Sequence, residues 1–328
     1  MEKCRLFIIG TIPPPIGGVT VHTKRLMDYL DQFGIKYIFI PLITRNLPRI
    51  FGTMLFIRER TIFHFHSSNS IVKSLLSLIS KLNRNAIFIN TMHGNLITKH
   101  GWNYRLHYLS LRWADYPIML NQGSYDVIKV CNKNAKMLSA FIPPVVRESL
   151  PIDFQKQIDA FKEDHSYIFA TNAYNLSYQG KEETYGGSHL MEVFNKMDAS
   201  VGLIFSDPTG NYKQFLKDKF SVLPPNVLFL NGMHSFYEVM AQSDCLIRYT
   251  ASDGDSLSIR EALYLGKPVI TTDVVSRPEG VTLLRYGDDE ALINMLNFFV
   301  KTDVKQASVK VINGADQLKS LYEQIIRE

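Results

Sequence analysis

The sequence of 328 residues predicts an α/β fold made of two Rossmann-like, doubly wound domains that face a central cleft. Three observations lead to this prediction. Short apolar runs alternate with segments whose apolar residues recur at i, i+3, i+4 and i+7, as in a parallel sheet covered by helices. The alternation pauses once and then starts again. The length suits two domains of ordinary size, and ligands of such sheets bind at the carboxyl ends of the strands.

The first half of the chain contains five apolar runs that predict buried strands. They are residues 5–10, 36–42, 61–67, 86–94 and 116–121. Segments of helical period lie between them, at residues 18–34, 70–83 and 103–114. Three prolines then interrupt the pattern within residues 140–155, which predicts a linker. We therefore expect one domain over residues 1–148 and a second over residues 149–328.

The second half repeats the pattern. The predicted strands are residues 166–172, 199–207, 226–232, 244–250 and 267–273. The predicted helices between them are residues 187–197, 235–242 and 258–266.

The composition bounds the class of protein. With 46% hydrophobic and 20% charged residues, the chain can bury proper cores and is not disordered. No apolar run approaches the roughly 18 to 20 residues that a membrane span needs, and the first run is too short for a signal peptide. The 3 cysteines are scattered, which favours a reduced, cytosolic location.

Charge divides unevenly between the halves. Residues 1–150 hold 19 Lys and Arg against 7 Asp and Glu, a balance of +12. Residues 151–328 hold 17 against 24, a balance of −7. Either surface charge has drifted at random, or the first half meets an anionic partner such as a phospholipid surface or a diphosphate-linked substrate.

The stretch "SDGDSLSIREALYLGKPVITTD" (252–273) carries the clearest functional signal. A turn at Asp253-Gly254-Asp255 precedes a helix that we expect to start near Ser256. The first amides of a helix are unpaired and lie at its positive end, so Ser256, Leu257 and Ser258 would bind a diphosphate. Two alternatives remain: the two aspartates hold a metal ion, or the turn caps the helix and binds nothing.

The order of several motifs adds a resemblance. A turn with Gly17-Gly18 follows the first strand, "HFH" and "TMHG" strand ends come next, and an acidic-x7-Glu segment precedes "EALYLGKPVITTD". In this order the chain resembles the retaining glycosyltransferases of family 4, which have the two-domain GT-B fold. The likeness covers nearly the whole length. It implies a hexosyl-type transfer from a nucleotide-diphosphate sugar to a hydroxyl with retained configuration, and no metal or other cofactor.

The resemblance also assigns residues. It places Glu261 on the ribose, Asp253 near the hydroxyls of the donor sugar, and His93 in hydrogen-bonding distance of that sugar. Asn172, at the end of the strand over residues 166–172, is expected among the contacts to the nucleotide sugar. The last helix, residues 316–328, is expected to cross back onto the first domain.

The glycines Gly17 and Gly18 have two interpretations. They form an ordinary tight turn, or they let the backbone approach the donor phosphates or the acceptor. The spacing is not the Gly-x-Gly-x-x-Gly of dinucleotide-binding proteins, which argues against an NAD enzyme.

One departure from the family concerns the cations that neutralise the leaving diphosphate. The family has an Arg, and a Lys before a glycine, after the first strand of its second domain, whereas this chain has Tyr185 there and only Lys181 as a cation. Arg248 is our candidate replacement, with Arg277 behind it, because a guanidinium binds phosphate through two hydrogen bonds. The alternative is that Arg248 forms a salt bridge with Asp253 or Asp255.

Four histidines have structural alternatives. His93 is either the sugar contact or a turn residue before glycine. His64 and His66, two apart on one face of a strand, could bind zinc with His93, but no carboxylate or cysteine completes the set, so we interpret them as strand-end residues under the cleft. His22 is interpreted as a packing or capping histidine in the first helix.

Residues 45–60 combine arginines with large apolar residues, which is typical of a segment on an anionic membrane or of a domain-edge helix. The expected partners are a nucleotide-sugar donor, a glycan or polyprenyl-diphosphate-linked acceptor and anionic lipid, with no nucleic acid. We expect an enzyme of bacterial O-antigen, capsule or exopolysaccharide synthesis at the cytosolic face of the membrane. A sugar-nucleotide epimerase of the same fold and a non-catalytic partner subunit are the alternatives.

Overall fold

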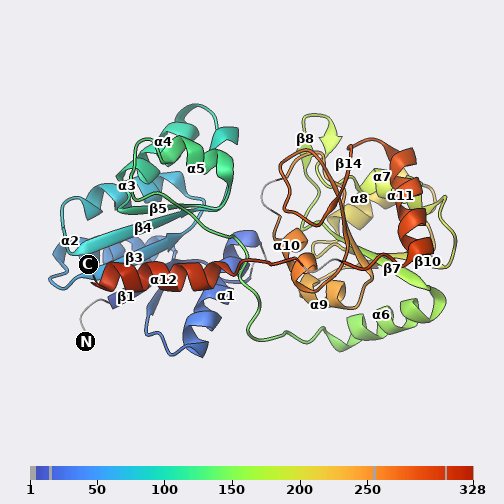
Figure 1. The fold of residues 1–328 in the computed structure, drawn as a ribbon, viewed down its shortest axis with the longest axis horizontal. Coiled ribbons are helices and arrows are strands. Elements are labelled where there is room, and N and C mark those ends of the chain that lie inside the picture. The colour runs from blue at the N-terminus through green and yellow to red at the C-terminus, as the bar shows by residue number, and fades with distance from the viewer. Residues whose placement is uncertain (1–4, 15–16, 254–255, 307–308, 328) are drawn as a thin grey trace. The chain divides into compact units, whose positions relative to one another are not determined.

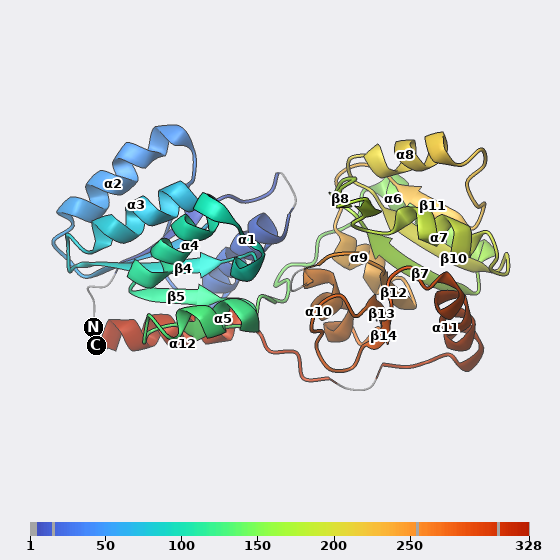
Figure 2. The ribbon, with the colours of Figure 1, turned by 90° about the horizontal axis from the view of Figure 1, so that it is seen from above.

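The computed structural model describes residues 5–14, 17–253, 256–306 and 309–327 (Figures 1 and 2). The chain divides into two compact units. The first unit is Met1–Val146 with Ile312–Glu328, and the second unit is Arg147–Val311. The sequence had placed the division between residues 148 and 149.

The first unit contains a six-stranded parallel sheet with the order β2-β1-β3-β4-β5-β6. Its strands are β1 (Arg5–Gly10), β2 (Ile38–Pro41), β3 (Thr61–His66), β4 (Ala86–Met92), β5 (Tyr116–Met119) and β6 (Lys136–Met137). Its α-helices are α1 (Gly18–Gln32), α2 (Leu47–Phe56), α3 (Ser70–Ser80), α4 (Gly101–Trp113), α5 (Gln122–Ile128) and α12 (Gly314–Arg327). Two short 3-10 helices cover Thr44–Asn46 and Leu96–Thr98.

Both faces of this sheet carry a core, because side chains alternate along each strand. In β1, Leu6 and Ile8 face a cluster that includes residues of α1 and α12. Phe7 and Ile9 face the opposite cluster, with residues of α2 and α3. Figure 1 shows α12, in red, beside the strands of the first unit, and its buried Leu318 and Ile325 belong to that core. The chain end thus completes the first unit.

The second unit contains another six-stranded parallel sheet, with the order β11-β10-β7-β12-β13-β14. Its strands are β7 (Tyr167–Asn172), β10 (Val201–Ser206), β11 (Val227–Leu230), β12 (Cys245–Arg248), β13 (Val269–Thr272) and β14 (Thr282–Leu284). A small antiparallel pair is formed by β8 (Tyr178–Gln179) and β9 (Glu182–Glu183). Its helices are α6 (Ile152–Asp164), α7 (Gly187–Phe194), α8 (Asn211–Lys219), α9 (Phe236–Ala241), α10 (Leu257–Tyr264) and α11 (Asp289–Thr302).

The strand orders locate a switch point in each sheet. In the first unit, β2 lies on one side of β1 and β3 on the other. In the second unit, the chain runs from β7 outward through β10 and β11, and then returns to place β12 on the other side of β7. Connections leave a switch point in opposite directions, which opens a crevice at the carboxyl ends of the two strands. The fold therefore indicates the ends of β1 and β3, and of β7 and β12, as places for ligands.

The predicted class of two doubly wound parallel sheets is confirmed. The division between the units falls within residues 140–155, which had been interpreted as a linker, and the last residues of that range already belong to α6. This helix exposes most of its residues and buries only Ile158 fully, so its apolar period is weak. None of the helices in the described ranges combines the length and apolar character needed to cross a bilayer.

Candidate functional site

The carboxyl edge of the second sheet gathers several of the residues that the sequence singled out. Asn172 ends β7 and Arg248 ends β12, on the two sides of the switch point. The side chain of Arg248 reaches across, and its Nη1 lies 3.4 Å from both the backbone oxygen and Oδ1 of Asn172. The parallel register that places these two strands side by side therefore also brings their terminal side chains together.

Arg248 and Arg277 share one carboxylate. Arg248 donates from Nε and Nη2 to the two oxygens of Asp253, at 3.1 and 3.0 Å. Arg277 donates from Nη1 to Asp253 Oδ2 at 2.8 Å. All three side chains are buried, with 10%, 2% and 7% of the Arg248, Arg277 and Asp253 side chains exposed. The salt bridge that the sequence offered as the alternative for Arg248 is therefore present.

Backbone and hydroxyl groups fix the second guanidinium. Arg277 donates from Nε to the backbone oxygen of Thr272 at 3.0 Å, and its Nη2 lies 3.4 Å from Thr250 Oγ1. Thr272 ends β13, and Thr250 follows β12. Arg277 is thus attached to the loops that follow two adjacent strands, although it lies 24 residues from Asp253 in the chain.

The pKa values reflect this pairing. Burial lowers the pKa of Arg248, but the charge and hydrogen bonds of Asp253 together with Tyr185 outweigh burial and raise the pKa above its usual value. Burial would raise the pKa of Asp253, but Arg248 and Arg277 hold it below its usual range. The carboxylate of Asp253 and the guanidinium of Arg248 are therefore charged at neutral pH. Among the described residues, these two guanidiniums and one carboxylate have a net charge of one positive unit.

Tyr185 connects this group to α7. The guanidinium carbon of Arg248 lies 5.0 Å from the centre of the Tyr185 ring, a cation–π contact. Gly186 follows with a φ of 55°, and a Cβ there would approach the backbone oxygen of Tyr249 to 2.8 Å. Only glycine suits that position. Arg248 thus contacts the residue that stands where the resembling family has lysine.

The predicted helix after the acidic turn is α10, and its N-cap is Ser256. Ser256 and Ser258 are buried and their hydroxyls lie 3.0 Å apart, while Leu257 is the first residue of the helix. Glu261 is 4% exposed, one and a half turns into α10. Gly254, a predicted nucleotide contact, lies outside the described residues.

The metal interpretation of the two aspartates is weakened by these contacts. Both oxygens of Asp253 already accept hydrogen bonds from guanidinium groups. A divalent cation at the same oxygens would meet two positive charges. Asp255 lies outside the described residues. The geometry of Asp253 is that of an arginine partner.

Sequence reasoning missed a second polar cluster, at the start of α7. Glu183, which is 8% exposed, accepts hydrogen bonds from the Ser188 backbone at 3.0 Å and from its hydroxyl. Tyr212 donates to the same carboxylate at 3.2 Å, and Lys219 of α8 donates to Ser188 Oγ at 2.7 Å. Lys219 is thus a cation of this region that the sequence did not indicate. Within the segment that follows β7, the sequence had shown only the exposed Lys181 as a cation, because α8 comes later in the chain.

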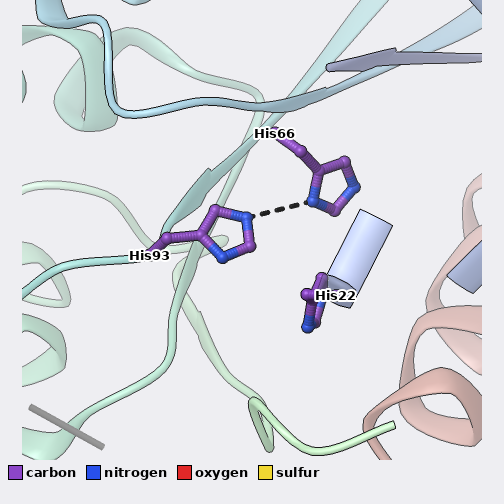
Figure 3. A group of neighbouring side chains, drawn as sticks. All are labelled: His22, His66 and His93. Carbon is purple, nitrogen blue, oxygen red and sulfur yellow. Dashed lines mark hydrogen bonds between the residues drawn. The ribbon is translucent and has the colours of Figure 1, made fainter. Parts of the chain in front are cut away.

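The carboxyl edge of the first sheet is rich in histidine (Figure 3). His66 ends β3, His93 follows β4, and His22 lies on α1. His66 Nδ1 lies 3.1 Å from His93 Nε2. His22 uses Nδ1 to contact the backbone oxygen of Ala140 at 2.9 Å, which agrees with its interpretation as a packing residue. Burial lowers the pKa of His22 to about 4, and lowers those of His66 and His93 well below the usual value.

His64 differs from its neighbours because both its ring nitrogens have partners. Tyr322 of α12 lies 2.5 Å from Nδ1, and Thr91 Oγ1 lies 2.7 Å from Nε2. Beside it, the buried Lys73 donates to the backbone oxygen of Thr91 at 2.9 Å, and burial lowers its pKa to about 7. The sequence had suggested His64, His66 and His93 as possible zinc ligands. In the fold, His64 has other partners, and His22 lies beside His66 and His93.

The glycines at the start of α1 lie near the same edge. Gly17 is the N-cap of α1, with extended backbone, and Gly18 is the first residue of the helix. Among the described residues, a Cβ added at Gly18 would meet no atom within 4 Å. Protein packing therefore does not explain the glycine at that position.

Comparisons with known proteins bear on the fold. No model of a known protein family matches the chain, and no curated protein sequence does. Solved structures do match over nearly the full length. HepE of Anabaena, solved in complex with UDP-glucose, is 16% identical with a TM-score of 0.69, and the match covers 98% of each chain. A glycosyltransferase from Rickettsia africae is 14% identical with a TM-score of 0.70 and 99% of each chain covered.

A third match is the lipopolysaccharide outer core galactosyltransferase WaaB, at 14% identity and a TM-score of 0.61, with 92% of this chain and 91% of WaaB covered. The likeness shows the fold. The chain has the two-domain fold of these GT-B glycosyltransferases, as its motifs had indicated. Identities this low carry no further statement about donor, acceptor or stereochemistry.

Proposed function

We propose that this chain is a glycosyltransferase that moves a sugar from a nucleotide-diphosphate donor to a hydroxyl group. The observation that carries the proposal is the buried pair Arg248 and Arg277, which share the single carboxylate of Asp253 at the switch point of the second sheet. Neighbouring structures with this fold include HepE in complex with UDP-glucose, which supports uridine diphosphate sugars as the first donors to test.

The charge of this group suits a leaving diphosphate. Among the described residues, one buried carboxylate between two guanidiniums leaves one positive charge, and buried charges are costly unless an opposite charge comes near. Arg248 is better placed than Arg277 to contact the diphosphate. It lies beside Asn172, which ends β7, and beside Tyr185, which shortly precedes α7. In this proposal Asp253 is a positioning residue that orients both guanidiniums.

The nucleotide would be bound next to this group. The N-terminus of α10, with Ser256, Leu257 and Ser258, offers amides to the phosphates. Glu261 would accept hydrogen bonds from the ribose hydroxyls, as the resemblance to family 4 implies. Asn172 would add a contact to the sugar nucleotide at the end of β7.

Residues of the first unit would take the sugar. His93 is neutral at pH 7, since burial lowers its pKa, and it would hydrogen-bond a sugar hydroxyl and not act as a base. The backbone at Gly17 and Gly18 would approach the donor phosphates or the acceptor. The bond from the anomeric carbon to the diphosphate breaks with its electrons on the diphosphate oxygen. That oxygen takes the proton of the acceptor hydroxyl as the new bond forms on the same face, so configuration is retained.

The proposed acceptor is a lipid-linked glycan at the cytosolic leaflet, in the synthesis of a bacterial surface polysaccharide. The excess of 19 basic over 7 acidic residues in residues 1–150 supports an anionic surface as partner. At α2, Phe56 is 80% exposed, and Arg45, Arg49 and Arg58 are exposed near it. Exposed aromatic and basic side chains together favour the lipid interface.

The test is incubation of the protein with nucleotide sugars, with and without a lipid-linked glycan acceptor. The expected result is nucleotide release with product formation that needs the acceptor and continues in EDTA. A change of the sugar in donor alone would identify an epimerase. Absence of nucleotide release with every donor and acceptor would indicate a non-catalytic partner subunit. If EDTA abolishes activity and Mg²⁺ or Mn²⁺ restores it, the interpretation of Asp253 as a metal ligand would be supported.

A further inference from the structure

Three imidazole rings converge at the carboxyl edge of the first sheet, each from a different element (Figure 3). One ring nitrogen of each of His22, His66 and His93 lies within 4.8 Å of the other two. His22 and His66 are 4% and 0% exposed, and His93 is partly exposed. The cluster is thus closed toward the core and open at His93.

Nε2 of His22 is buried and has no partner among the described residues. Nε2 of His66 is also buried and without a partner there, but the His66 nitrogen on the side of His93 is Nδ1, so the orphan that an ion would satisfy is that of His22. An unpartnered buried nitrogen is costly, and its presence calls for an explanation. In His22 the carbonyl of Ala140 can only accept, so Nδ1 carries the proton and Nε2 carries a lone pair. A backbone carbonyl that fixes the outer nitrogen is the usual support of a metal-binding histidine.

The spacing of the rings fits one shared ion. Nitrogens that bind zinc tetrahedrally at 2.0–2.1 Å lie about 3.3 Å apart, and their ring centres lie about 5.2 Å apart. His66 Nδ1 and His93 Nε2 are 3.1 Å apart. The ring centres are separated by 5.4 Å for His22 and His66, 4.9 Å for His22 and His93, and 5.4 Å for His66 and His93.

We propose that His22, His66 and His93 form a binding site for a nitrogen-preferring divalent ion of the zinc class. Three imidazoles and no carboxylate favour zinc over magnesium or calcium, which prefer oxygen ligands. Three protein ligands leave a fourth position for water or for a hydroxyl of a bound sugar. This site lies in the first unit and takes nitrogen ligands, so it is independent of any ion on the diphosphate.

Neighbouring groups set the electrostatics of the site. Burial keeps the three imidazoles neutral at pH 7 by lowering their pKa values, and neutral imidazole is the form that binds metal. Lys73 is close enough to lower the pKa values of His66 and His93, so its charge opposes a cation. His64 is excluded as a fourth ligand, because Tyr322 and Thr91 occupy both its nitrogens.

The test uses the full chain without an affinity tag, stripped with EDTA and desalted. Zinc chloride is titrated by calorimetry, and cobalt chloride by visible absorption. We expect one equivalent of zinc and the intense bands of tetrahedral cobalt, which zinc abolishes. His22→Gln and His66→Gln should each weaken binding at least about tenfold, the scale seen when support of a metal site is lost. His100→Gln, at an exposed histidine of the same unit, should bind as the wild type does.

Folding of each variant is checked by circular dichroism and by the fluorescence of Trp102 and Trp113 in α4. If a variant fails to fold, the cobalt spectrum of the wild type decides. Octahedral cobalt bands, a wild type that binds less than one equivalent, or variants that bind as tightly as the wild type would overturn the proposal. In that case the short distance between His66 and His93 reflects a hydrogen bond between the two rings and no metal ion. Activity lost in EDTA and restored only by zinc would connect this site to transfer.

Discussion

The carboxyl edges of the two sheets differ in how they bury ionisable side chains. In the first unit, four histidines gather at or beneath the edge, and burial holds them neutral by lowering their pKa values. In the second unit, Arg248, Arg277 and Asp253 are buried with their charges, because each guanidinium is paired with the same carboxylate. The same sheet architecture therefore supports a neutral, hydrogen-bonding edge and a charged one.

The difference suggests a division of labour. A charged edge stabilises the charge that develops on a leaving diphosphate, since preorganised charges act strongly where water is excluded. Neutral imidazoles at the other edge can hydrogen-bond sugar hydroxyls without themselves attracting anions. The contrast predicts that changes in the second unit alter turnover and nucleotide binding, whereas changes in the first unit alter contacts with sugar and surface.

Arg248→Ala should give the largest effect. Loss of this guanidinium removes one of the two arginines that pair with Asp253, and with it one positive charge of the group. We expect kcat to fall by about 10² to 10³, the cost of losing one preorganised donor in a transition state, with a smaller change in donor binding. Steady-state kinetics with varied donor measure both. Arg285→Ala, at an exposed arginine of the same unit, is the control, and unchanged kinetics in Arg248→Ala would assign the role to another cation.

The surface of the first unit is tested with vesicles that contain anionic lipid. Replacing the exposed Arg45, Arg49 and Arg58 with glutamine should weaken vesicle binding by about 3 kcal/mol, or roughly a hundredfold, and leave nucleotide binding intact. Arg60, which the sequence had included, is only half-exposed and its Nε is buried.

The matched control for that triple variant removes as many charges from the second unit, at the exposed Lys156, Lys196 and Lys217. It should bind vesicles as the wild type does, and binding should weaken with added salt. If the wild-type protein does not bind anionic vesicles even at low salt, the charge asymmetry between the halves has another cause.

Glu261→Ala should weaken binding of the nucleoside diphosphate by about 1 to 3 kcal/mol, because the ribose hydroxyls would lose their acceptor. Calorimetry with the diphosphate alone measures this without an acceptor. Glu279→Ala, at an exposed position, is the control. Equal affinities of Glu261→Ala and the wild type would remove Glu261 from the ribose contact.

The smallest expected effect concerns pH. Burial lowers the pKa of His107 in α4 to about 4, so below pH 6.5 the unfolded chain takes up a proton that the folded chain refuses. Stability of the first unit should therefore fall as pH drops from 6.5 to 4, by roughly 5 °C in Tm.

Both tryptophans, Trp102 and Trp113, lie in α4, so tryptophan fluorescence in the presence of EDTA follows the first unit. Hydrogen exchange of second-unit peptides follows the other unit and should change less. His107→Gln should reduce the loss seen by fluorescence. A first unit equally stable at pH 6.5 and 4.5 would contradict the burial of neutral histidines.

The sequence was informative wherever local pattern decides structure. The strands over residues 61–66 and 167–172 are short, largely apolar segments, and α10 starts where an acidic turn and a serine predicted it. The pattern failed where few residues are buried. In α8 only Tyr212 and Leu216 are buried, and β6 has two residues, so neither produces a readable period.

The candidate site was predictable in its parts and not in its contacts. Proximity in the chain suggested that Arg248 would meet Asp253, five residues away. Three other contacts depend on how distant strands and helices pack. They are the contacts of Arg277 with the same carboxylate, of Lys219 with Ser188, and of His22 with His66 and His93. No local periodicity contains that information.

The most direct test of the central claim is hydrogen exchange of the full chain with and without saturating uridine or guanosine diphosphate. The account predicts slower exchange, with at least one of them, in the peptides that span residues 172–188 and 245–261 of the second unit. Arg248→Ala should reduce that protection. Absence of protection by either nucleotide, or protection confined to the histidine-rich edge of the first unit, would contradict the assignment of the donor site to Arg248, Arg277 and α10.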